Sequence, residues 1–289
     1  MDDDKRECDD SSCTEESCAG CSHANSDGTC GGEQGGISKE VPLADSHIRK
    51  IIGVVSGKGG VGKSMVTSLL ASQMSKAGFS SAVLDADMTG PSIPRMFGLR
   101  NKTVTGDAEG INPLASKGGV TVMSANLILE NETDPVIWRG PVVSNVIKQF
   151  FTEVHWGNVD YMFVDMPPGT GDVPLTVFQS LPVDGIVIVA TPQQLVGMIV
   201  TKAVKMAAQM EVPVLGLIEN MSYLVCPDCG SKIQLFGKGH ADYIADEYDI
   251  PVLCKLPMNP EFADACDRGN VEDIELEEIA PMVDALKKM

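Results

Sequence analysis

The chain has 289 residues, of which 43% are hydrophobic, and this length can bury the core of one domain or at most two. Its formal net charge of −18 argues against nucleic acid or a membrane surface as the main partner, because both are bound through basic patches. The acidic start is unlike a secretory signal and no apolar run approaches the roughly 20 residues of a membrane span, so we expect a cytoplasmic protein.

Residues 1–47 are rich in Asp, Glu, Ser, Gly and Cys, with few large apolar side chains. Such a segment cannot bury enough surface to offset the entropy of ordering, so we expect a Cys-rich flexible N-terminal tail ahead of a domain over 48–289. Cysteines in a cytosolic protein are better candidates for metal ligands than for disulfides. The tail is therefore a candidate metal-binding arm for a second cluster or for zinc, with the ligands Cys8, Cys13, Cys18 and Cys21.

From Arg49 onward, short apolar runs alternate with helical patterns. The expected strands are Lys50–Ser56, Ser81–Asp85, Val120–Ser124, Tyr161–Asp165, Gly185–Thr191, Val214–Glu219 and Val252–Lys255. The expected helices are Met65–Ala77, Val142–Val154, Leu195–Met210 and His240–Glu247. Strands that are apolar on both sides and separated by helices predict an α/β fold whose parallel sheet is covered on both faces. Ligands of such folds collect at the carboxyl ends of the strands.

A glycine-rich segment follows the first expected strand and precedes the first expected helix. It reads Gly57-Lys58-Gly59-Gly60-Val61-Gly62-Lys63-Ser64. This context is typical of a phosphate-binding loop (P-loop), whose backbone N–H groups point at an anion. We expect Lys63 to bind the β- and γ-phosphates of ATP and the Ser64 hydroxyl to coordinate Mg2+. Lys58 lies too early in the loop to duplicate Lys63, so we expect its charge to act on a partner subunit's nucleotide.

Aspartates stand at the ends of two expected strands. Asp85 and Asp87 close the second strand, and Asp165 closes the strand that runs into Pro167-Pro168-Gly169. A carboxylate beside a phosphate-binding loop can hold Mg2+ or orient an attacking water, and we assign these catalytic roles to Asp87 and Asp165. Capping of a helix or turn is the other interpretation, and it stays open for Asp85 and Asp172.

A second pair of candidate ligands is the CxxC sequence Cys226-Pro227-Asp228-Cys229, a thiolate pair in a tight turn suited to iron or zinc. Two thiolates cannot complete a four-ligand site. The other two must come from the tail or from a second copy of the chain, and a symmetric dimer supplies them. Zinc accepts the same four thiolates, so a structural zinc clasp stays open.

Six segments in this order resemble the Mrp/ApbC-type P-loop ATPases, which include scaffold proteins for cytosolic iron-sulfur cluster assembly. The resemblance spans roughly residues 48–270 and includes the two-lysine loop of this superfamily, a deviant Walker A type. The segments are 57–64, 85–96, 165–172, Thr191-Pro192-Gln193, Glu219-Asn220-Met221-Ser222-Tyr223 and 226–229.

This resemblance implies an ATPase that works as a homodimer, carries a 4Fe-4S cluster and transfers it to recipient apo iron-sulfur proteins. It implies that Lys58 acts across the dimer and that Asn220 contacts adenine. It also implies that Cys226 and Cys229 bind the transferable cluster between the subunits. One departure concerns Met65 of the nucleotide-binding segment, because the family usually has a threonine there and a hydroxyl contact to the α-phosphate is missing.

Another departure is the spacing of the tail cysteines, whose first gap is shorter than in eukaryotic scaffolds with an amino-terminal cluster. Two other functions fit parts of the sequence. A spatial-regulator ATPase of the MinD type shares the two-lysine loop, but it predicts a basic amphipathic carboxyl-terminal helix, whereas residues 271–279 are acidic. A nickel or zinc metallochaperone NTPase would use the tail as its metal-binding arm.

Overall fold

The computed structural model describes residues 39–88, 90–129, 140–193, 196–237, 239 and 241–289, so the tail cysteines lie outside the described residues. The compact unit begins at Lys39, ahead of the boundary after residue 47 that composition indicates. The Lys39 ammonium donates to Phe178 O, and Glu40 N donates to Ser180 O at 2.7 Å. Residues 39–47 therefore contact the folded domain.

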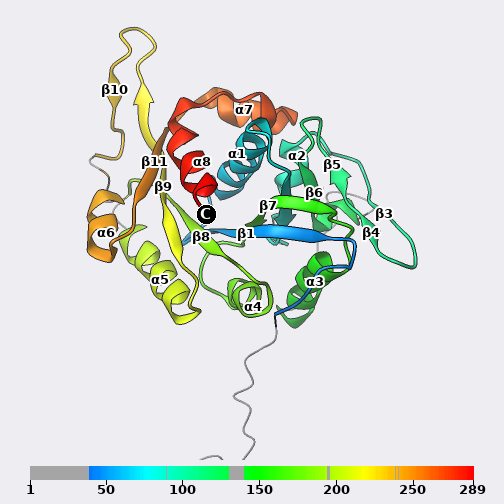
Figure 1. Cartoon of the computed structure of the whole chain (residues 1–289). Helices are drawn as coiled ribbons and strands as arrows, with labels where there is room; N and C mark the ends of the chain where they lie inside the picture. Colours follow the sequence, from blue (N-terminus) through cyan, green and yellow to red (C-terminus); the bar gives the residue numbers. More distant parts are fainter. Residues whose placement is uncertain (1–38, 89, 130–139, 194–195, 238, 240) are drawn as a thin grey trace, which may run out of the picture. The chain divides into compact units, whose positions relative to one another are not determined.

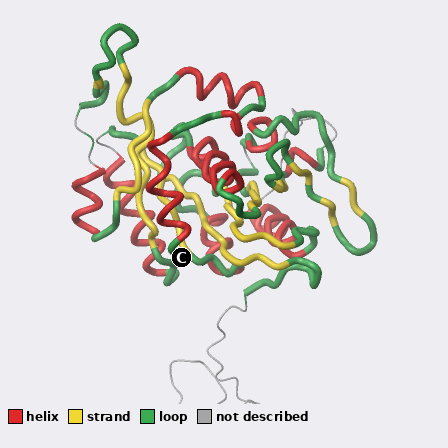
Figure 2. The backbone as a smooth tube through the Cα atoms, turned by 45° about the horizontal axis from the view of Figure 1, so that its top comes forward, coloured by secondary structure: helices red, strands yellow, loops and turns green. Residues whose placement is uncertain are grey.

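A twisted, mostly parallel sheet forms the centre of the domain (Figures 1 and 2). Nine strands pair in the order β10-β9-β8-β1-β7-β2-β6-β5, with β11 also paired to β9. The main strands are β1 His47–Ser56, β2 Ser81–Asp85, β6 Thr121–Met123, β7 Asn158–Asp165, β8 Gly185–Ala190, β9 Val214–Val225 and β11 Val252–Pro257. All seven expected strands are confirmed, and so is the α/β fold.

Helices cover both faces of this sheet (Figure 1). One layer contains α1 Lys63–Lys76, α2 Ile93–Met96, α7 Pro260–Arg268 and α8 Ala280–Lys287. The other contains α3 Gly140–Thr152, α4 Asp172–Ser180, α5 Val196–Gln209 and α6 Ala241–Tyr248. Side chains alternate along β1, so that Ile51 and Val55 join one hydrophobic cluster while Ile52 and Val54 join the other. A strand apolar on both sides is therefore buried between two helical layers.

The edges of the sheet differ from the expectation of parallel pairing. The short strands β5 Leu114–Ala115 and β10 Lys232–Ile233 pair antiparallel to β6 and β9, and β3 Thr105–Gly106 pairs with β4 Ile111–Asn112 in a separate ribbon. Two-residue strands are too short to leave a periodic pattern in the sequence. Three 3-10 segments complete the described elements: Ala125–Leu127, Val271–Asp273 and Glu277–Ile279.

Strand β9 runs further than expected, past Glu219 to Val225, and turns into β10 to make a hairpin that projects from the body (Figures 1 and 2). Met221 has φ of 56° within this strand, a left-handed conformation that is uncommon for a residue with a side chain. The Tyr223 hydroxyl donates to Glu278 Oε1 at 2.8 Å, which ties the base of the hairpin to the domain. The hairpin is therefore anchored at its base and free of the core at its tip.

Candidate functional site

The loop between β1 and α1 curls around a cavity of about 230 Å³. Gly60 and Gly62 have φ of 77° and 80°, in the left-handed region that favours glycine. Helix α1 begins directly after Gly62, so its unpaired N–H groups lie at the loop. The cavity is lined by residues 58–65, including Met65, together with Ser56, Asp87, Ser92, Met96 and Pro168. This cradle fits a chain of phosphates.

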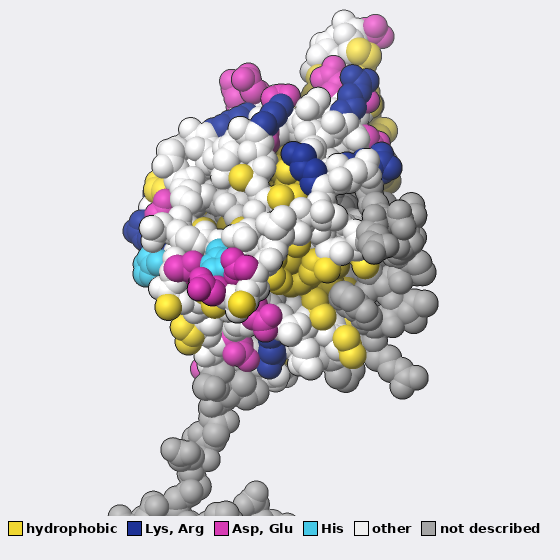
Figure 3. Space-filling view, turned by 90° about the vertical axis from the view of Figure 1, so that its right-hand side faces the viewer, with side chains coloured by type: hydrophobic (Ala, Val, Ile, Leu, Met, Phe, Trp, Pro, Cys, Tyr) yellow, Lys and Arg dark blue, Asp and Glu magenta, His cyan; other side chains and the backbone are white. Residues whose placement is uncertain are grey.

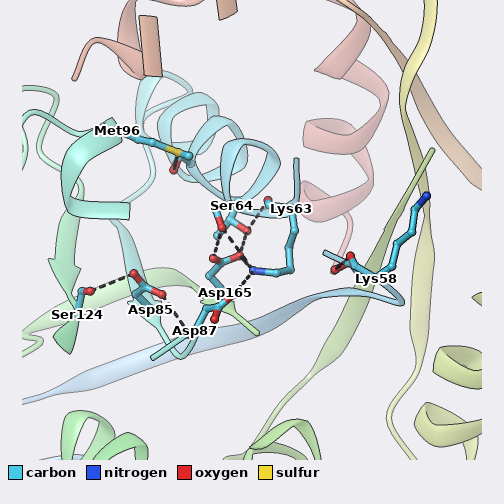
Figure 4. A network of polar contacts seen from close by, with 11 residues as sticks. Lys58, Lys63, Ser64, Asp85, Asp87, Met96, Ser124 and Asp165 are labelled. Carbon is cyan, nitrogen blue, oxygen red and sulfur yellow. Dashed lines mark hydrogen bonds and ion pairs between the residues drawn. The ribbon is translucent and has the colours of Figure 1, made fainter. Parts of the chain in front are cut away.

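Lys63 and Ser64 both contact Asp165 at the base of the cavity (Figure 4). The Lys63 ammonium lies 2.8 Å from Asp165 Oδ1 and 3.8 Å from Asp87 Oδ2. The Ser64 hydroxyl donates to Asp165 Oδ2 at 2.6 Å. Four of the residues selected from the sequence thus lie together, brought there by strand pairing, since Val54 of β1 lies beside Asp165 of β7.

Thr67, which the sequence-based selection missed, also belongs to this cluster. Its hydroxyl donates to Asp165 Oδ1 at 2.8 Å from a fully buried position. Thr67 lies one helical turn after Lys63, so its spacing places it on the same face of α1 and could have indicated the contact. Asp165 therefore accepts hydrogen bonds from two hydroxyls and pairs with one ammonium, which fixes the carboxylate in a single orientation.

Asp85 lies beside this cluster and is fully buried. The Ser124 hydroxyl donates to its Oδ2 at 3.0 Å, and the backbone N–H of Asp87 donates to its Oδ1 at 3.2 Å. Burial raises the pKa of Asp85 well above its usual range, and the neighbouring charge of Asp165 raises it further. Asp85 thus caps the turn that carries Asp87, as the turn interpretation left open from the sequence allows, and it begins no helix.

Lys58 lies apart from Lys63, although both lysines come from one loop. Its side chain points away from Asp165 and Asp87 (Figure 4). The Lys58 ammonium donates to Gln193 Oε1, in the segment that follows β8. The Lys58 ammonium is thus held by a neutral amide and directed away from the carboxylates of its own site. The spacing of residues in the loop does not by itself predict this direction of the Lys58 side chain.

Asn220 connects β9 to the phosphate-binding loop. Its side chain is 1% exposed, and Nδ2 donates to Val61 O at 2.8 Å. A Cβ atom on Gly62 would lie 2.3 Å from Asn220 Nδ2, so only glycine leaves room for this contact. The expected contact of Asn220 with adenine remains a prediction.

Cys226 and Cys229 lie in the turn between β9 and β10. Cys226 N donates to Ser231 O and Gly230 N donates to Cys226 O, both at 2.9 Å, which closes the turn. Cys229 Sγ lies 3.0 Å from Ser231 Oγ. Hydrogen bonding to Ser231 lowers the pKa of the exposed Cys229 thiol and so favours the thiolate, the form that binds metals.

No group of three His, Cys, Asp or Glu side chains that could hold a metal ion is found among the described residues. Among the described residues, one chain therefore supplies two metal ligands at the CxxC turn, Cys226 and Cys229. No helix in the described part of the chain is long and apolar enough to cross a membrane.

Comparison with known proteins identifies relatives. Residues 47–289 match the model of the family described as ParA: NUBPL iron-transfer P-loop NTPase. An iron-sulfur cluster carrier protein of Clostridium perfringens is 45% identical over 89% of this chain and 94% of its own length. A protein of the same name from Methanocaldococcus jannaschii is 43% identical over 78% of both chains.

Solved structures give the same picture of the fold. A nucleotide-binding protein of Archaeoglobus fulgidus in complex with ADP is 42% identical, with a TM-score of 0.72 over 80% of this chain and 90% of its own. The MinC:MinD cell division complex of Aquifex aeolicus has a TM-score of 0.59 over 83% of this chain and 94% of its own, at 19% identity. This second likeness extends to the fold alone and does not favour the spatial-regulator alternative.

Proposed function

We propose that this chain, which belongs to the family of ParA: NUBPL iron-transfer P-loop NTPases, is an ATP-dependent carrier of iron-sulfur clusters. In this proposal two copies bind one 4Fe-4S cluster as cargo and transfer it to recipient apoproteins in the cytoplasm. The names of relatives at 43–45% identity support an iron-sulfur cluster as the cargo. The ADP complex of the Archaeoglobus protein supports a nucleotide site.

The nucleotide site is supported by the shape and charge of the cradle. Loop amides and the start of α1 would bind phosphate oxygens, and Lys63 would exchange its contact with Asp165 for them. Ser64 and Asp165 would hold Mg2+, which supplies positive charge at the transferring phosphate when bound, and Asp87 at the rim would position water. An oxygen-ligand set of a hydroxyl and carboxylates is the kind that Mg2+ prefers.

Lys58 would serve the partner's site. A lysine that points away from its own carboxylates can place positive charge on phosphate oxygens of a second subunit, where negative charge develops during transfer. The neutral amide of Gln193 holds this ammonium without neutralising it. ATP hydrolysis would therefore depend on formation of the dimer.

The observation that carries the coupling of the two sites is the course of β9. Asn220 in this strand bonds to the phosphate-binding loop, and the same strand leads to Cys226 of the CxxC turn. A change of the loop on nucleotide binding would act on Asn220 and, through the bend at Met221, on the hairpin. This coupling would open or shield the cluster according to the nucleotide.

The cluster site can be tested in a chain that starts at Lys39, the first residue of the compact unit. Cys226→Ser and Cys229→Ser should each abolish iron uptake on anaerobic reconstitution and transfer to an apo 4Fe-4S acceptor, while most ATPase activity remains. Cys254→Ala, which removes a thiol from β11, is the control and should retain both. One zinc per dimer with neither iron uptake nor transfer would replace the carrier by a structural zinc clasp.

A further inference from the structure

The base of the projecting hairpin contains a buried carboxyl group that the nucleotide site does not use. The hairpin stands clear of the body (Figures 1 and 3), and Glu219 lies at its base in β9, where the side chain is 2% exposed. The Ser222 hydroxyl donates to Glu219 Oε1, whereas Oε2 is buried and has no hydrogen-bond partner in the described part of the chain. Buried polar atoms are nearly always hydrogen-bonded, so this unpaired oxygen requires an explanation.

A second buried glutamate shows how this fold satisfies such a group where it only closes a turn. Glu272 is also buried, and its Oε1 accepts from the Ser116 hydroxyl at 2.7 Å. The backbone N–H of Gly118 lies 3.1 Å from Oε1 and 3.2 Å from Oε2 of the same carboxylate. Both oxygens of Glu272 therefore have a donor. Glu219 differs in having an acceptor that the present arrangement does not use.

The side chain of Glu219 contacts both ends of the segment that carries the CxxC turn. Ser222, which donates to Oε1, lies where β9 enters the hairpin. Gly239 lies after the hairpin, and a Cβ atom on it would be 2.2 Å from Glu219 Oε2. Cys226 and Cys229 lie between these two contacts in the sequence. A shift of this one carboxyl group therefore acts on the entry and on the exit of the hairpin together.

The bond between Glu219 and Ser222 also closes the bend of β9. Asn220 and Met221 lie between the two bonded residues, and the left-handed conformation of Met221 is of the kind that persists only where its surroundings hold it. Neighbouring side chains of a strand point to opposite faces, so Asn220 reaches Val61 O of the phosphate-binding loop from the face opposite Glu219. The loop and the carboxyl group are thus one residue apart along β9.

Resting on the proposed function, we propose that Glu219 is a positioning residue that transmits the nucleotide state of the loop to the CxxC turn. In the present arrangement Oε1 holds the bend through Ser222 and Oε2 is unpaired. When nucleotide displaces Asn220, the bend shifts and Oε2 accepts a hydrogen bond from the backbone at Gly239. Because an unpaired buried acceptor destabilises the present arrangement, a modest change at the loop suffices to populate the other one. The hairpin thereby takes two positions, and nucleotide selects between them.

The test measures the rate at which iodoacetamide alkylates Cys229 in the metal-free full chain, as a ratio with and without a saturating non-hydrolysable ATP analogue. Ser222→Ala removes the bond to Glu219 and should bring this ratio to one, and Ser222→Thr, which keeps the hydroxyl, should restore it. Ser116→Ala is the matched control, because it breaks the corresponding bond between a serine and the buried Glu272. It should lower the melting temperature and yet keep the wild-type ratio.

A second variant addresses the unpaired oxygen alone. Glu219→Gln keeps an acceptor for the Ser222 hydroxyl and replaces the unpaired oxygen by an amide NH2 group, so it should retain the melting temperature of the wild type and lose the nucleotide effect at Cys229.

A wild-type ratio in Ser222→Ala or in Glu219→Gln, or loss of the ratio in Ser116→Ala, would overturn the inference and leave the carrier proposal intact. A wild-type chain whose Cys229 does not respond to nucleotide would overturn it as well. The carrier proposal has a separate readout, because alkylation is followed without metal. It fails if the reconstituted wild type neither takes up iron nor transfers a cluster, whatever the alkylation ratios are.

Discussion

The side-chain amide of Asn220 donates to the backbone oxygen of Val61 at 2.8 Å, so the strand that leads to the CxxC turn is bonded to the phosphate-binding loop. Asn220→Ala removes this donor and leaves a buried carbonyl without its partner, a loss of about 1–3 kcal/mol. We expect weaker nucleotide binding and, above all, loss of the effect of nucleotide on alkylation of Cys229.

The matched control for that variant is Gln73→Ala, because Gln73 also donates a side-chain amide to a backbone oxygen, that of Ile274, away from both sites. It should retain the wild-type response to nucleotide. If Asn220→Ala also keeps the full response, β9 does not transmit the state of the loop.

Substitution of the two lysines of the loop should have different effects on ATP binding and on ATP hydrolysis. Lys63→Ala should abolish productive ATP binding, because Lys63 is the buried ammonium at the cradle. Lys58→Ala should retain most ATP binding but lower the rate of hydrolysis by about 100-fold or more. This is the typical effect of removing one group that stabilises the charge developing in the transition state. Nucleotide titration and phosphate release measure the two effects, and wild-type hydrolysis by Lys58→Ala would remove the cross-dimer role.

Gln193→Glu should lower ATPase activity, because a carboxylate would pair with the Lys58 ammonium and neutralise it where the amide only holds it. Salt screens such an exposed pair, so activity should recover as ionic strength rises. Gln193→Met, which lacks the acceptor and the charge, should show no recovery with salt. An identical salt dependence of both variants and the wild type would contradict this role.

Asp85 should make the domain less stable as pH rises. Its pKa is raised in the folded state by burial, so at a pH between the unfolded and folded pKa values the folded state keeps a proton that the unfolded state has lost. The stabilising effect is fully present below the unfolded value, 3.8, and is lost as pH rises through the folded value.

Asp85→Asn resembles the protonated form and should therefore raise the melting temperature at pH 7, by about 2–4 °C for each kcal/mol gained. The pH dependence of melting should become flatter at the same time. Asp160→Asn, at a partly exposed carboxylate that accepts from Ser80 N, is the control and should not raise the melting temperature. A lower melting temperature of Asp85→Asn at pH 7 would show that the carboxylate is needed in its charged form.

Cys229 should react with iodoacetamide before the buried cysteines Cys254 and Cys266. Hydrogen bonding to Ser231 lowers the pKa of the exposed Cys229 thiol, whereas burial raises the pKa of Cys254 to about 12 and of Cys266 to about 11. The thiolate is the reactive form, so Cys229 should be alkylated before Cys254 and Cys266 and at lower pH. Ser231→Ala should shift the pH profile of Cys229 upward. Mass spectrometry of peptides measures each site, and equal rates at Cys229 and Cys254 would contradict the prediction.

The tail can be tested as a metal-binding arm by deleting residues 1–38, which precede the compact unit. Iron bound per chain should fall, while ATP hydrolysis and the dimer should persist because their residues lie in the compact unit. Replacement of Cys8, Cys13, Cys18 and Cys21 by serine in the full chain separates loss of thiols from loss of length. Equal iron content in all three proteins would exclude this role of the tail.

Local sequence determined the phosphate-binding loop and the CxxC pair, because each is a short motif whose chemistry depends on neighbouring residues. Glycines at 60 and 62 are needed for left-handed backbone, and the order of strand, loop and helix is visible in hydrophobic pattern alone. The alternation of apolar strands with helices likewise predicted the α/β fold, since a strand buried on both faces needs two helical layers.

Tertiary structure decided which residues meet. Thr67 and Asp165 are 98 positions apart, and only the pairing of β1 with β7 brings them together. The contact of Gln193 with Lys58 depends in the same way on β8 lying beside β1. The projecting hairpin could not be predicted from the sequence, because β10 is two residues long and β9 continues through a bend at Met221. Contacts between distant segments follow from strand order, which no local pattern encodes.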